Sequence, residues 1–493
     1  MIINFKRPII PRSTTTALAW VSSFQLSQVI LRTIINLILA KLLLPSDFGI
    51  IAIINVFSEI TFSIINMGMG AAIVQKKSLD EKHFTSAYFG NFIMAFFLTL
   101  LVFLLAKPIS VFYQTPELER LIKLLSVVFI VRGITTVQYS YYEKYLCFNI
   151  TIGISLISLL ISSVIKIVLA YNGFGVDSVI LGDILFHLLI SIIISVKSRY
   201  IPKISNVSFQ KFKELFRFGN RIMFSDLLSI LSQKFDVLII GKLTSSKDLG
   251  FYAFAYMVSI SIISSINSVL QQVFFPKFSQ IQDDFNELKR VYFETIKYLS
   301  IFALPITVGI FFIAEDFVLA FYDGKWNDSI LLIKLLSIYA ATNALGGVLW
   351  GQILKAKGYS NYVLRLTYLR IFALFITIYF TLQYSNIYGL AWGLIIYGIF
   401  FRFLLQYFVN KILGFRMREY INAIKPSFKV AIVFFVSILI IKFIISALTT
   451  SSLLRLLLLT TAIFIVYFAV LIIFANKEVS FIFDIIRRKY MND

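Results

Sequence analysis

Residues 39–52 read LAKLLLPSDFGIIA, and residues 240–253 read IGKLTSSKDLGFYA. The two segments align at a constant offset of 201 residues, with identities at Lys41/Lys242, Leu42/Leu243, Asp47/Asp248, Gly49/Gly250 and Ala52/Ala253. Each segment is a short link between two apolar runs. Because the matches include Lys, Asp and Gly as well as aliphatic residues, we interpret the two links as equivalent points of an internal repeat.

Apolar runs long enough to cross a bilayer as a helix recur along the whole chain. Of the 493 residues, 59% are hydrophobic, whereas soluble domains contain about 45–50% apolar residues. The pattern predicts an all-α polytopic membrane protein with about 14 transmembrane helices. The predicted spans are 17–42, 48–70, 84–106, 119–142, 150–171, 177–196, 215–240, 249–272, 293–315, 328–352, 362–383, 387–409, 425–447 and 453–475.

The repeat divides these spans into two lobes of six helices and a C-terminal helix pair. Because each lobe has an even number of spans, the lobes are predicted to be parallel repeats, related by an axis along the membrane normal. The predicted domains are the N-terminal lobe (1–200), a basic cytoplasmic linker (201–214), the C-terminal lobe (215–410), and the last two helices with a basic cytoplasmic tail (411–493).

Positive charge predicts the orientation of the chain. The sequence has 46 Lys and Arg against 25 Asp and Glu, a formal net charge of +21. The cations concentrate in the two terminal segments and in every second loop, which marks the cytoplasmic side. Both termini are therefore expected in the cytoplasm. The cations form no single patch, so we expect no nucleic-acid partner.

Polar residues inside the spans are candidates for a substrate cavity, because buried polar groups in a bilayer are costly. The first span carries Gln25, Gln28, Arg32 and Asn36 within one arc of the helix. The repeat offset maps three of them onto Asp226, Ser229 and Gln233 of the seventh span. Two equivalent polar stripes predict a water-filled cavity shared by the lobes.

Further intramembrane charges are cavity candidates as well: Glu59, Lys166, Lys234, Arg370 and Arg402. Each has an alternative role as a structural ion pair between helices or as a side chain that reaches the headgroups. Four titratable groups are candidates for coupling to H⁺ or Na⁺, namely Glu59, Asp183, His187 and Asp226. Asp183 and His187 are one helical turn apart. The central positions of Arg32 and Glu59 in their spans favour the cavity, whereas the structural role is favoured for Lys234 and Arg402.

Catalytic and metal motifs are absent from the sequence. It has no G-x-x-x-x-G-K-[ST] and no H-E-x-x-H, and Cys147 is the single cysteine. We therefore expect no catalytic residues, no ATP hydrolysis, no metal site and no cofactor beyond a possible coupling ion. The outer loops are too short for a large sugar-binding domain, so a membrane glycosyltransferase or polymerase is a weaker alternative.

Several segments resemble a known family. The first half contains LLLPSDFGIIA, MGMGAAIVQKKSLDEKHFTSAYFGN and YQTPELERLIKLLSVVFIVRGI, and the second contains KFDVLIIGKLTSSKDLGFYAFAY, VFFPKFSQIQDD and GKWNDSILLIKLLSIYAA. These segments resemble the polysaccharide transporter (Wzx-type flippase) family of the MOP superfamily, in the branch of colanic-acid and teichuronic-acid exporters. The resemblance covers most of residues 15–410, whereas the last two spans are generic.

The resemblance implies a flippase that moves an undecaprenyl-diphosphate-linked oligosaccharide across the bacterial inner membrane by alternating access. Such units serve lipopolysaccharide O-antigen, capsule or exopolysaccharide biosynthesis, and a polysaccharide polymerase and chain-length proteins are the implied partners besides membrane lipids. The alternative within the superfamily is a MATE-like, ion-coupled antiporter for drugs or metabolites. The motifs favour the polysaccharide branch.

Overall fold

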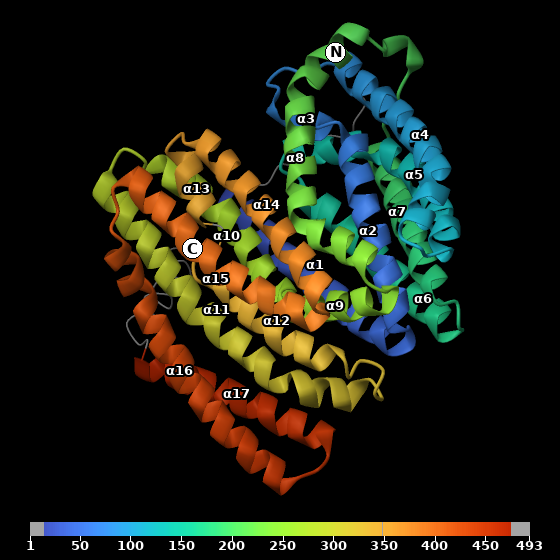
Figure 1. The fold of residues 1–493 in the computed structure, drawn as a ribbon. Helices are drawn as coiled ribbons and strands as arrows, with labels where there is room; N and C mark the ends of the chain where they lie inside the picture. Colours follow the sequence, from blue (N-terminus) through green and yellow to red (C-terminus); the bar gives the residue numbers. More distant parts are fainter. Residues whose placement is uncertain (1–13, 348, 475–493) are drawn as a thin grey trace. The chain divides into compact units, whose positions relative to one another are not determined.

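The computed structural model describes residues 14–347 and 349–474, with side chains described except at residues 14–26, 262, 268–273, 276 and 474. Over these residues the regular elements are helices and no strand occurs (Figure 1). The chain forms two compact units, one up to Gly250 and one from Phe251 onward. The predicted all-α polytopic class is confirmed, while the lobe boundaries drawn from the repeat stay a prediction.

Eleven helices among the described residues are long and apolar enough to cross a membrane. The exact number of spans stays a prediction, since α1 (Thr14–Leu42), α8 (Phe209–Leu243), α9 (Ser246–Ser259) and α10 (Ser261–Gln280) are not among the eleven. The eleven are α2 (Pro45–Asn66), α4 (Glu81–Phe112), α5 (Glu117–Lys144), α6 (Phe148–Tyr171), α7 (Val176–Ser198), α11 (Phe285–Phe321), α12 with α13 (Ser329–Ala344 and Leu349–Ala356), α14 (Ser360–Tyr384), α15 (Ile387–Leu413), α16 (Met417–Leu448) and α17 (Ser452–Phe474).

In the first unit, helices adjacent in sequence pack as antiparallel neighbours: α4 with α5, and α6 with α7. Helix α1 lies against α6, and α8 packs along α2, the short α3 (Met69–Gln75) and α4. Side-chain caps set where two of these helices begin. Asp80 accepts a hydrogen bond from the backbone N–H of His83 at the start of α4, and Ser208 accepts one from Lys211 at the start of α8.

The repeat-related glycines meet at the point where α2 and α9 begin. A Cβ atom on Gly49 would lie 1.9 Å from the carbonyl oxygen of Ser246, and one on Gly250 would lie 1.7 Å from that of Pro45. Ser246 is the repeat equivalent of Pro45, so the contact is reciprocal. Two backbones this close leave no room for a side chain, which explains why both links contain glycine at this position.

In the second unit, α11 packs against α12, α16 and α17, and α15 lies between α12 and α14. Two predicted spans are interrupted. The span 249–272 breaks at Ile260 between α9 and α10, and the span 328–352 breaks between α12 and α13. At the second break Gly346 has a φ of +93°, a conformation that a residue with a Cβ rarely adopts. Hydrophobicity along the sequence does not reveal such a helix break, because the residues on both sides of it are apolar.

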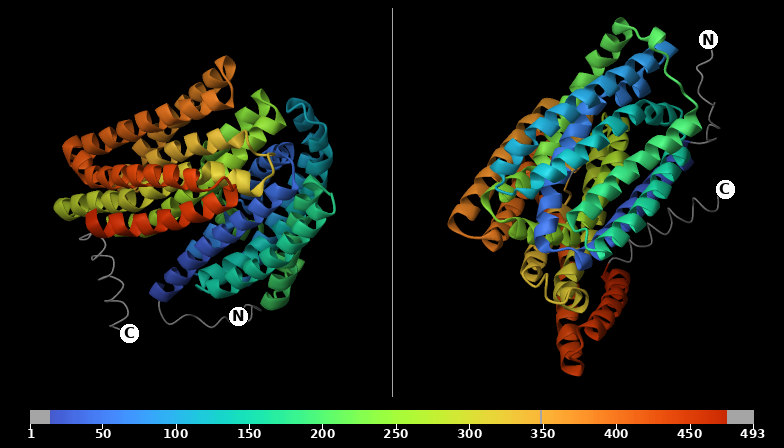
Figure 2. Two further views of the ribbon diagram at one scale, coloured as in Figure 1. Left: turned by 90° about the horizontal axis from the view of Figure 1, so that it is seen from below. Right: turned by 90° about the vertical axis from the view of Figure 1, so that its right-hand side faces the viewer.

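Helices α16 and α17 form a hairpin that packs on α11 (Figure 2). Asp316 of α11 is 3% exposed, and its carboxylate lies 3.5 Å from Lys442 Nζ of α16 and 3.4 Å from Arg455 Nε of α17. Lys442 also donates a hydrogen bond to the carbonyl oxygen of Phe312, at 3.0 Å. One buried carboxylate therefore connects three helices of the unit.

Replacing Asp316 by Asn is expected to lower the thermal midpoint of the purified protein. The change leaves two neighbouring cations without their shared carboxylate. Breaking a buried pair costs about 3–5 kcal/mol, and we expect roughly half of that because both cations are partly exposed. Asp283→Asn, at an exposed loop position, is the matched control and should leave the midpoint unchanged. Equal shifts for the two variants would contradict this role for Asp316.

Candidate functional site

Four basic side chains from four helices gather in the first unit: Arg32 of α1, Arg132 of α5, Lys166 of α6 and His187 of α7. We call them the basic cluster. The charges of the other three all act on His187, and Arg32 and Arg132 act on each other. Because like charges repel, such a group is expected only where water or an anion compensates it.

Two aromatic rings hold the cluster together. The guanidinium of Arg132 lies 4.4 Å from the centroid of Phe62, and the His187 ring lies 5.2 Å from the same centroid. Phe186 lies 5.0 Å from His187 and 5.8 Å from the guanidinium carbon of Arg32. A cation over an aromatic face is stabilised by the ring quadrupole. The two phenylalanines therefore orient the arginines without neutralising them.

The two arginines of the cluster remain available to an anion. Both side chains are exposed although each lies near the middle of a predicted span. Among the described residues no carboxylate forms an ion pair with Arg32 or with Arg132. A guanidinium presents five N–H donors in a planar fork that fits a phosphate. Arg32 and Arg132 thus have the type of donor that a phosphate group requires.

Lys166 differs from the arginines, because Asp183 of α7 accepts its hydrogen bond at 2.6 Å. The side chains are 14% and 31% exposed, respectively. Lys166 and Asp183 therefore form a structural ion pair between two helices, which is the alternative role that the sequence left open for Lys166. The pair also places one negative charge one turn before His187 and limits the excess of positive charge at the cluster.

Removing only the carboxylate of this pair is expected to destabilise the first unit. Asp183→Asn leaves Lys166 unpaired beside the other cations, whereas the double variant Lys166→Met/Asp183→Leu removes both charges together. We expect the single variant to lower the thermal midpoint and the double variant to recover most of the loss, with a coupling of about 1–3 kcal/mol. Additive effects of the Lys166→Met and Asp183→Leu single changes in the same assay would contradict a direct pair.

Other predicted charges lie in separate places. Lys234 Nζ of α8 lies 3.2 Å from Glu59 Oε1 of α2, and both side chains are partly exposed. Arg402, in the second unit, is buried and donates to the carbonyl oxygen of Gly347 at 3.2 Å. The backbone oxygen of Arg370 accepts a hydrogen bond from Tyr397, at 3.1 Å. Burial of Arg402 among packed helices favours its alternative, structural role.

The two polar stripes are partly described. Asn36 is exposed and Gln28 is half-buried, while the side chain of Gln25 lies outside the described residues. On α8, Asp226, Ser229 and Gln233 are all exposed, and Gln233 donates to the hydroxyl of Ser229 at 2.9 Å. The cavity that these stripes predict between the lobes stays a prediction.

Arg132 is the residue that sequence reasoning missed. It stands alone in the apolar run VVFIVRGIT (127–135), at the centre of a predicted span. That position was the available signal, because a charge at this depth is rarely accidental. It was overlooked since its partners Arg32, Phe62 and His187 are distant in sequence and the repeat provides no equivalent. In the part of the chain that the structure describes, no group of His, Cys, Asp and Glu side chains has the geometry of a metal site.

The fold is similar to those of known membrane transporters. A lipid II flippase, MurJ, in an inward closed conformation matches with a TM-score of 0.72 and 16% identity over 93% of this chain and 99% of that one. An inward-facing multidrug resistance transporter of the MATE family matches with a TM-score of 0.63 and 14% identity, over 80% of this chain and 98% of that one. At these identities the likeness concerns the fold alone.

The names of the sequence relatives refer to polysaccharide biosynthesis or to the cps region. The chain is 24% identical to an uncharacterized membrane protein in the cps region of Klebsiella pneumoniae (83% of this chain, 85% of the relative). It is 24% identical to the lipopolysaccharide biosynthesis protein WzxC of Escherichia coli (78% of each) and 25% identical to the teichuronic acid biosynthesis protein TuaB of Bacillus subtilis (62% of each). The family model described as polysaccharide biosynthesis protein matches residues 38–331. The resemblance seen in the sequence is thereby confirmed, and this multi-pass membrane protein belongs to the polysaccharide biosynthesis protein family.

Proposed function

We propose that this protein is a flippase that moves an undecaprenyl-diphosphate-linked oligosaccharide across the bacterial inner membrane, for lipopolysaccharide O-antigen, capsule or exopolysaccharide. The observation that carries the proposal is the pair of exposed arginines, Arg32 and Arg132, near mid-span and without a carboxylate partner among the described residues. Family membership, and relatives whose names refer to polysaccharide biosynthesis, support the same substrate class.

The basic cluster addresses the main physical obstacle to this transport. A diphosphate is strongly hydrated, and transferring it into hydrocarbon without compensation is prohibitive. Guanidinium groups replace water by short, charge-assisted hydrogen bonds. Phe62 and Phe186 hold Arg32 and Arg132 in place before the substrate arrives, which reduces the entropy lost on binding. We expect the amide and hydroxyl groups of Gln28, Ser229 and Gln233 to hydrogen-bond the sugars.

Alternating access is the proposed mechanism. The lipid-linked headgroup enters from the cytoplasmic side, binds the arginines and leaves on the outer side, while the polyprenyl chain stays in the bilayer. Both termini are proposed to lie in the cytoplasm, although residues 1–13 and 475–493 lie outside the described residues. A polymerase and chain-length proteins are the proposed partners. The protein is proposed to act as a transporter and not as an enzyme.

Of the four candidates for coupling to H⁺ or Na⁺, Glu59 and Asp183 each pair with a lysine, and His187 faces three cations. Asp226 is exposed on α8. A MATE-like antiporter remains the alternative within this fold, and it would predict drug sensitivity in place of polymer loss.

Deletion of the gene in its host tests the proposed function. We expect loss of surface polysaccharide and accumulation of polyprenyl-linked oligosaccharide on the cytoplasmic face of the membrane. Protection of that pool from externally added glycosidase in right-side-out vesicles reports its side. An unchanged polymer and an unchanged lipid-linked pool, together with new drug sensitivity, would overturn the proposal in favour of the antiporter.

A further inference from the structure

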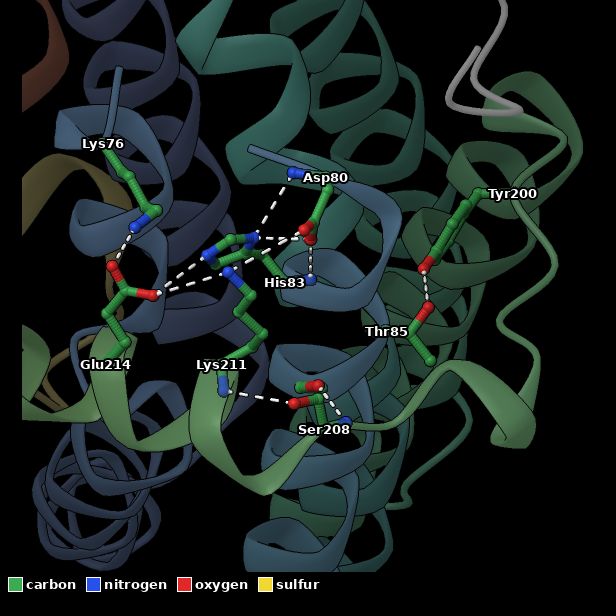
Figure 3. A network of polar contacts seen from close by, with 9 residues as sticks. Lys76, Asp80, His83, Thr85, Tyr200, Ser208, Lys211 and Glu214 are labelled. Atoms are coloured by element: carbon green, nitrogen blue, oxygen red, sulfur yellow. Dashed lines mark hydrogen bonds and ion pairs between the residues drawn. The ribbon is translucent and has the colours of Figure 1, made fainter. Parts of the chain in front are cut away.

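The starts of α4 and α8 are joined by a network of charged side chains (Figure 3). At its centre is His83 of α4, whose side chain is 3% exposed. Its Nδ1 lies 2.6 Å from Asp80 Oδ1, in the link before α4, and its Nε2 lies 3.3 Å from Glu214 Oε2 of α8. One buried imidazole therefore lies between two carboxylates, and the more distant of them, Glu214, is 131 residues from His83 in sequence.

The hydrogen bonds around His83 cannot all exist in one protonation state. A neutral imidazole has one N–H donor and one acceptor nitrogen, whereas an imidazolium has two donors. The backbone N–H of Asp80 lies 3.3 Å from Nδ1, which requires Nδ1 to accept. Hydrogen bonds to both carboxylates require Nδ1 and Nε2 to donate together. The contacts thus describe two alternative arrangements, and a single proton selects between them.

The charges that face His83 from the neighbouring elements keep both carboxylates ionised. Lys76, at the end of α3, pairs with Glu214, and Lys211 of α8 lies 3.9 Å from Asp80 and 4.0 Å from Glu214. Hydrogen bonds from Lys76 and His83 lower the pKa of Glu214. Burial acts to raise the pKa of Asp80, but its hydrogen bonds with His83 outweigh this effect and lower it. On the far side of Lys76, Lys144 of α5 donates to the carbonyl oxygens of Ile73 and Lys76.

The network lies near a close approach of α8 to the elements before it. A Cβ atom on Gly68, between α2 and α3, would lie 2.0 Å from the carbonyl oxygen of Gly219 in α8. The backbone N–H of Ser208 also donates to the hydroxyl of Ser86 in α4, at 2.9 Å. His83 therefore lies where the start of α8 meets α3 and α4.

We propose that His83 is a proton-binding site that locks the start of α8 against the α3–α4 connection. With a proton bound, the imidazolium donates to Asp80 and to Glu214 and joins the two segments through charge-assisted hydrogen bonds. Without it, Nδ1 accepts from the Asp80 backbone and repels the Asp80 carboxylate, while Nε2–H still donates to Glu214 but no longer carries a positive charge, so the link to α8 weakens. Low pH favours the locked arrangement, and high pH favours release. That the lock controls opening toward the cytoplasm rests on the proposed function.

Distance measurements between spin labels test the lock without reference to transport. Lys77, in the α3–α4 connection, and Lys213 of α8 are exposed and take no part in the network. Both are replaced by Cys and labelled in a Cys147→Ser background, and their distance distribution is recorded by pulsed electron paramagnetic resonance in nanodiscs. Histidine changes charge between about pH 5 and 8. We expect the short-distance population to be about twofold larger at pH 6 than at pH 8.

Two variants identify the group that is responsible. His83→Gln cannot take up a proton and should remove the pH dependence, whereas His187→Gln, which changes the other histidine of the chain, should keep it. Glu214→Gln, at a half-exposed position, should reduce the dependence if His83→Gln fails to fold. A distance distribution that is independent of pH in the parent would overturn the proposal. So would a pH dependence that survives His83→Gln, or one that is undiminished in Glu214→Gln where His83→Gln does not fold. Loss of polymer export with an intact lock would count against the proposed function only.

Discussion

Arg132→Gln is expected to reduce export of surface polysaccharide more than about tenfold at an unchanged level of membrane protein. The side chain carries one of the two guanidinium groups of the basic cluster, neither of which forms an ion pair with a carboxylate among the described residues, and Phe62 fixes its direction at 4.4 Å. A hydrogen bond to a charged group contributes about 1.5–3 kcal/mol, and about 1.4 kcal/mol corresponds to a factor of ten. Glutamine keeps the polarity of the position and removes the charge.

The measurement is the amount of cell-surface polymer in a deletion strain that carries each variant, together with the lipid-linked pool. Arg32→Ala is expected to show the same sharp loss. Arg132→Lys should retain part of the activity, because an ammonium keeps the charge but not the bidentate geometry. Arg120→Gln is the matched control: it is an exposed arginine of the same helix whose guanidinium pairs with Asp177, at 2.7 Å. We expect it to leave export close to normal.

Normal polymer with Arg132→Gln at normal expression would remove Arg132 from the proposed substrate site. If Arg120→Gln reduced export as much as Arg132→Gln, the removal of any positive charge from α5 would be harmful. In that case neither reduction in export would be evidence of phosphate binding. Accumulation of the lipid-linked pool in the arginine variants distinguishes a transport defect from a defect in synthesis, since only the former leaves the substrate in the membrane.

Gly49→Ala is expected to lower the thermal midpoint of the purified protein, with a destabilisation of about 1–3 kcal/mol. The added Cβ would lie 1.9 Å from the carbonyl oxygen of Ser246, so the starts of α2 and α9 must move apart. Neither neighbour is a flexible side chain that can rotate away. Gly250→Ala should have a similar effect, because its Cβ would meet the carbonyl oxygen of Pro45 at 1.7 Å.

The reciprocal geometry makes a sharper test possible. Once one alanine has separated the two backbones, the second finds more room, so the double variant should lose less stability than the sum of the single ones. Gly153→Ala is the matched control, because no atom lies within 4 Å of its added Cβ. In a helix interior this change removes backbone freedom from the unfolded chain and should be neutral or slightly stabilising. A Gly49→Ala midpoint equal to that of Gly153→Ala would contradict the close contact.

The arrangement of the candidate site was only partly predictable. Arg32, Lys166 and His187 were identified as polar groups within apolar spans, a signal that a single sequence contains. Whether such a group pairs or stays available could not be predicted, because the answer depends on which helix lies beside it. Asp183 pairs with Lys166 at 2.6 Å, and Arg402 is buried against a carbonyl group, whereas Arg132 is exposed beside Phe62. Sequence spacing contains no information on these neighbours.

The membrane class, the helical content and the internal repeat follow from the sequence, because helix length and hydrophobicity are local properties that the bilayer itself selects. Four other features depend on tertiary structure. They are the close contact of Gly49 with the second link, the breaks beside Ile260 and Gly346, the basic cluster around Phe62, and the buried position of His83 between two carboxylates. The contacts among them join residues that are far apart in the chain, and all of these features depend on packing and charge at short distance, which exist only once the helices have assembled.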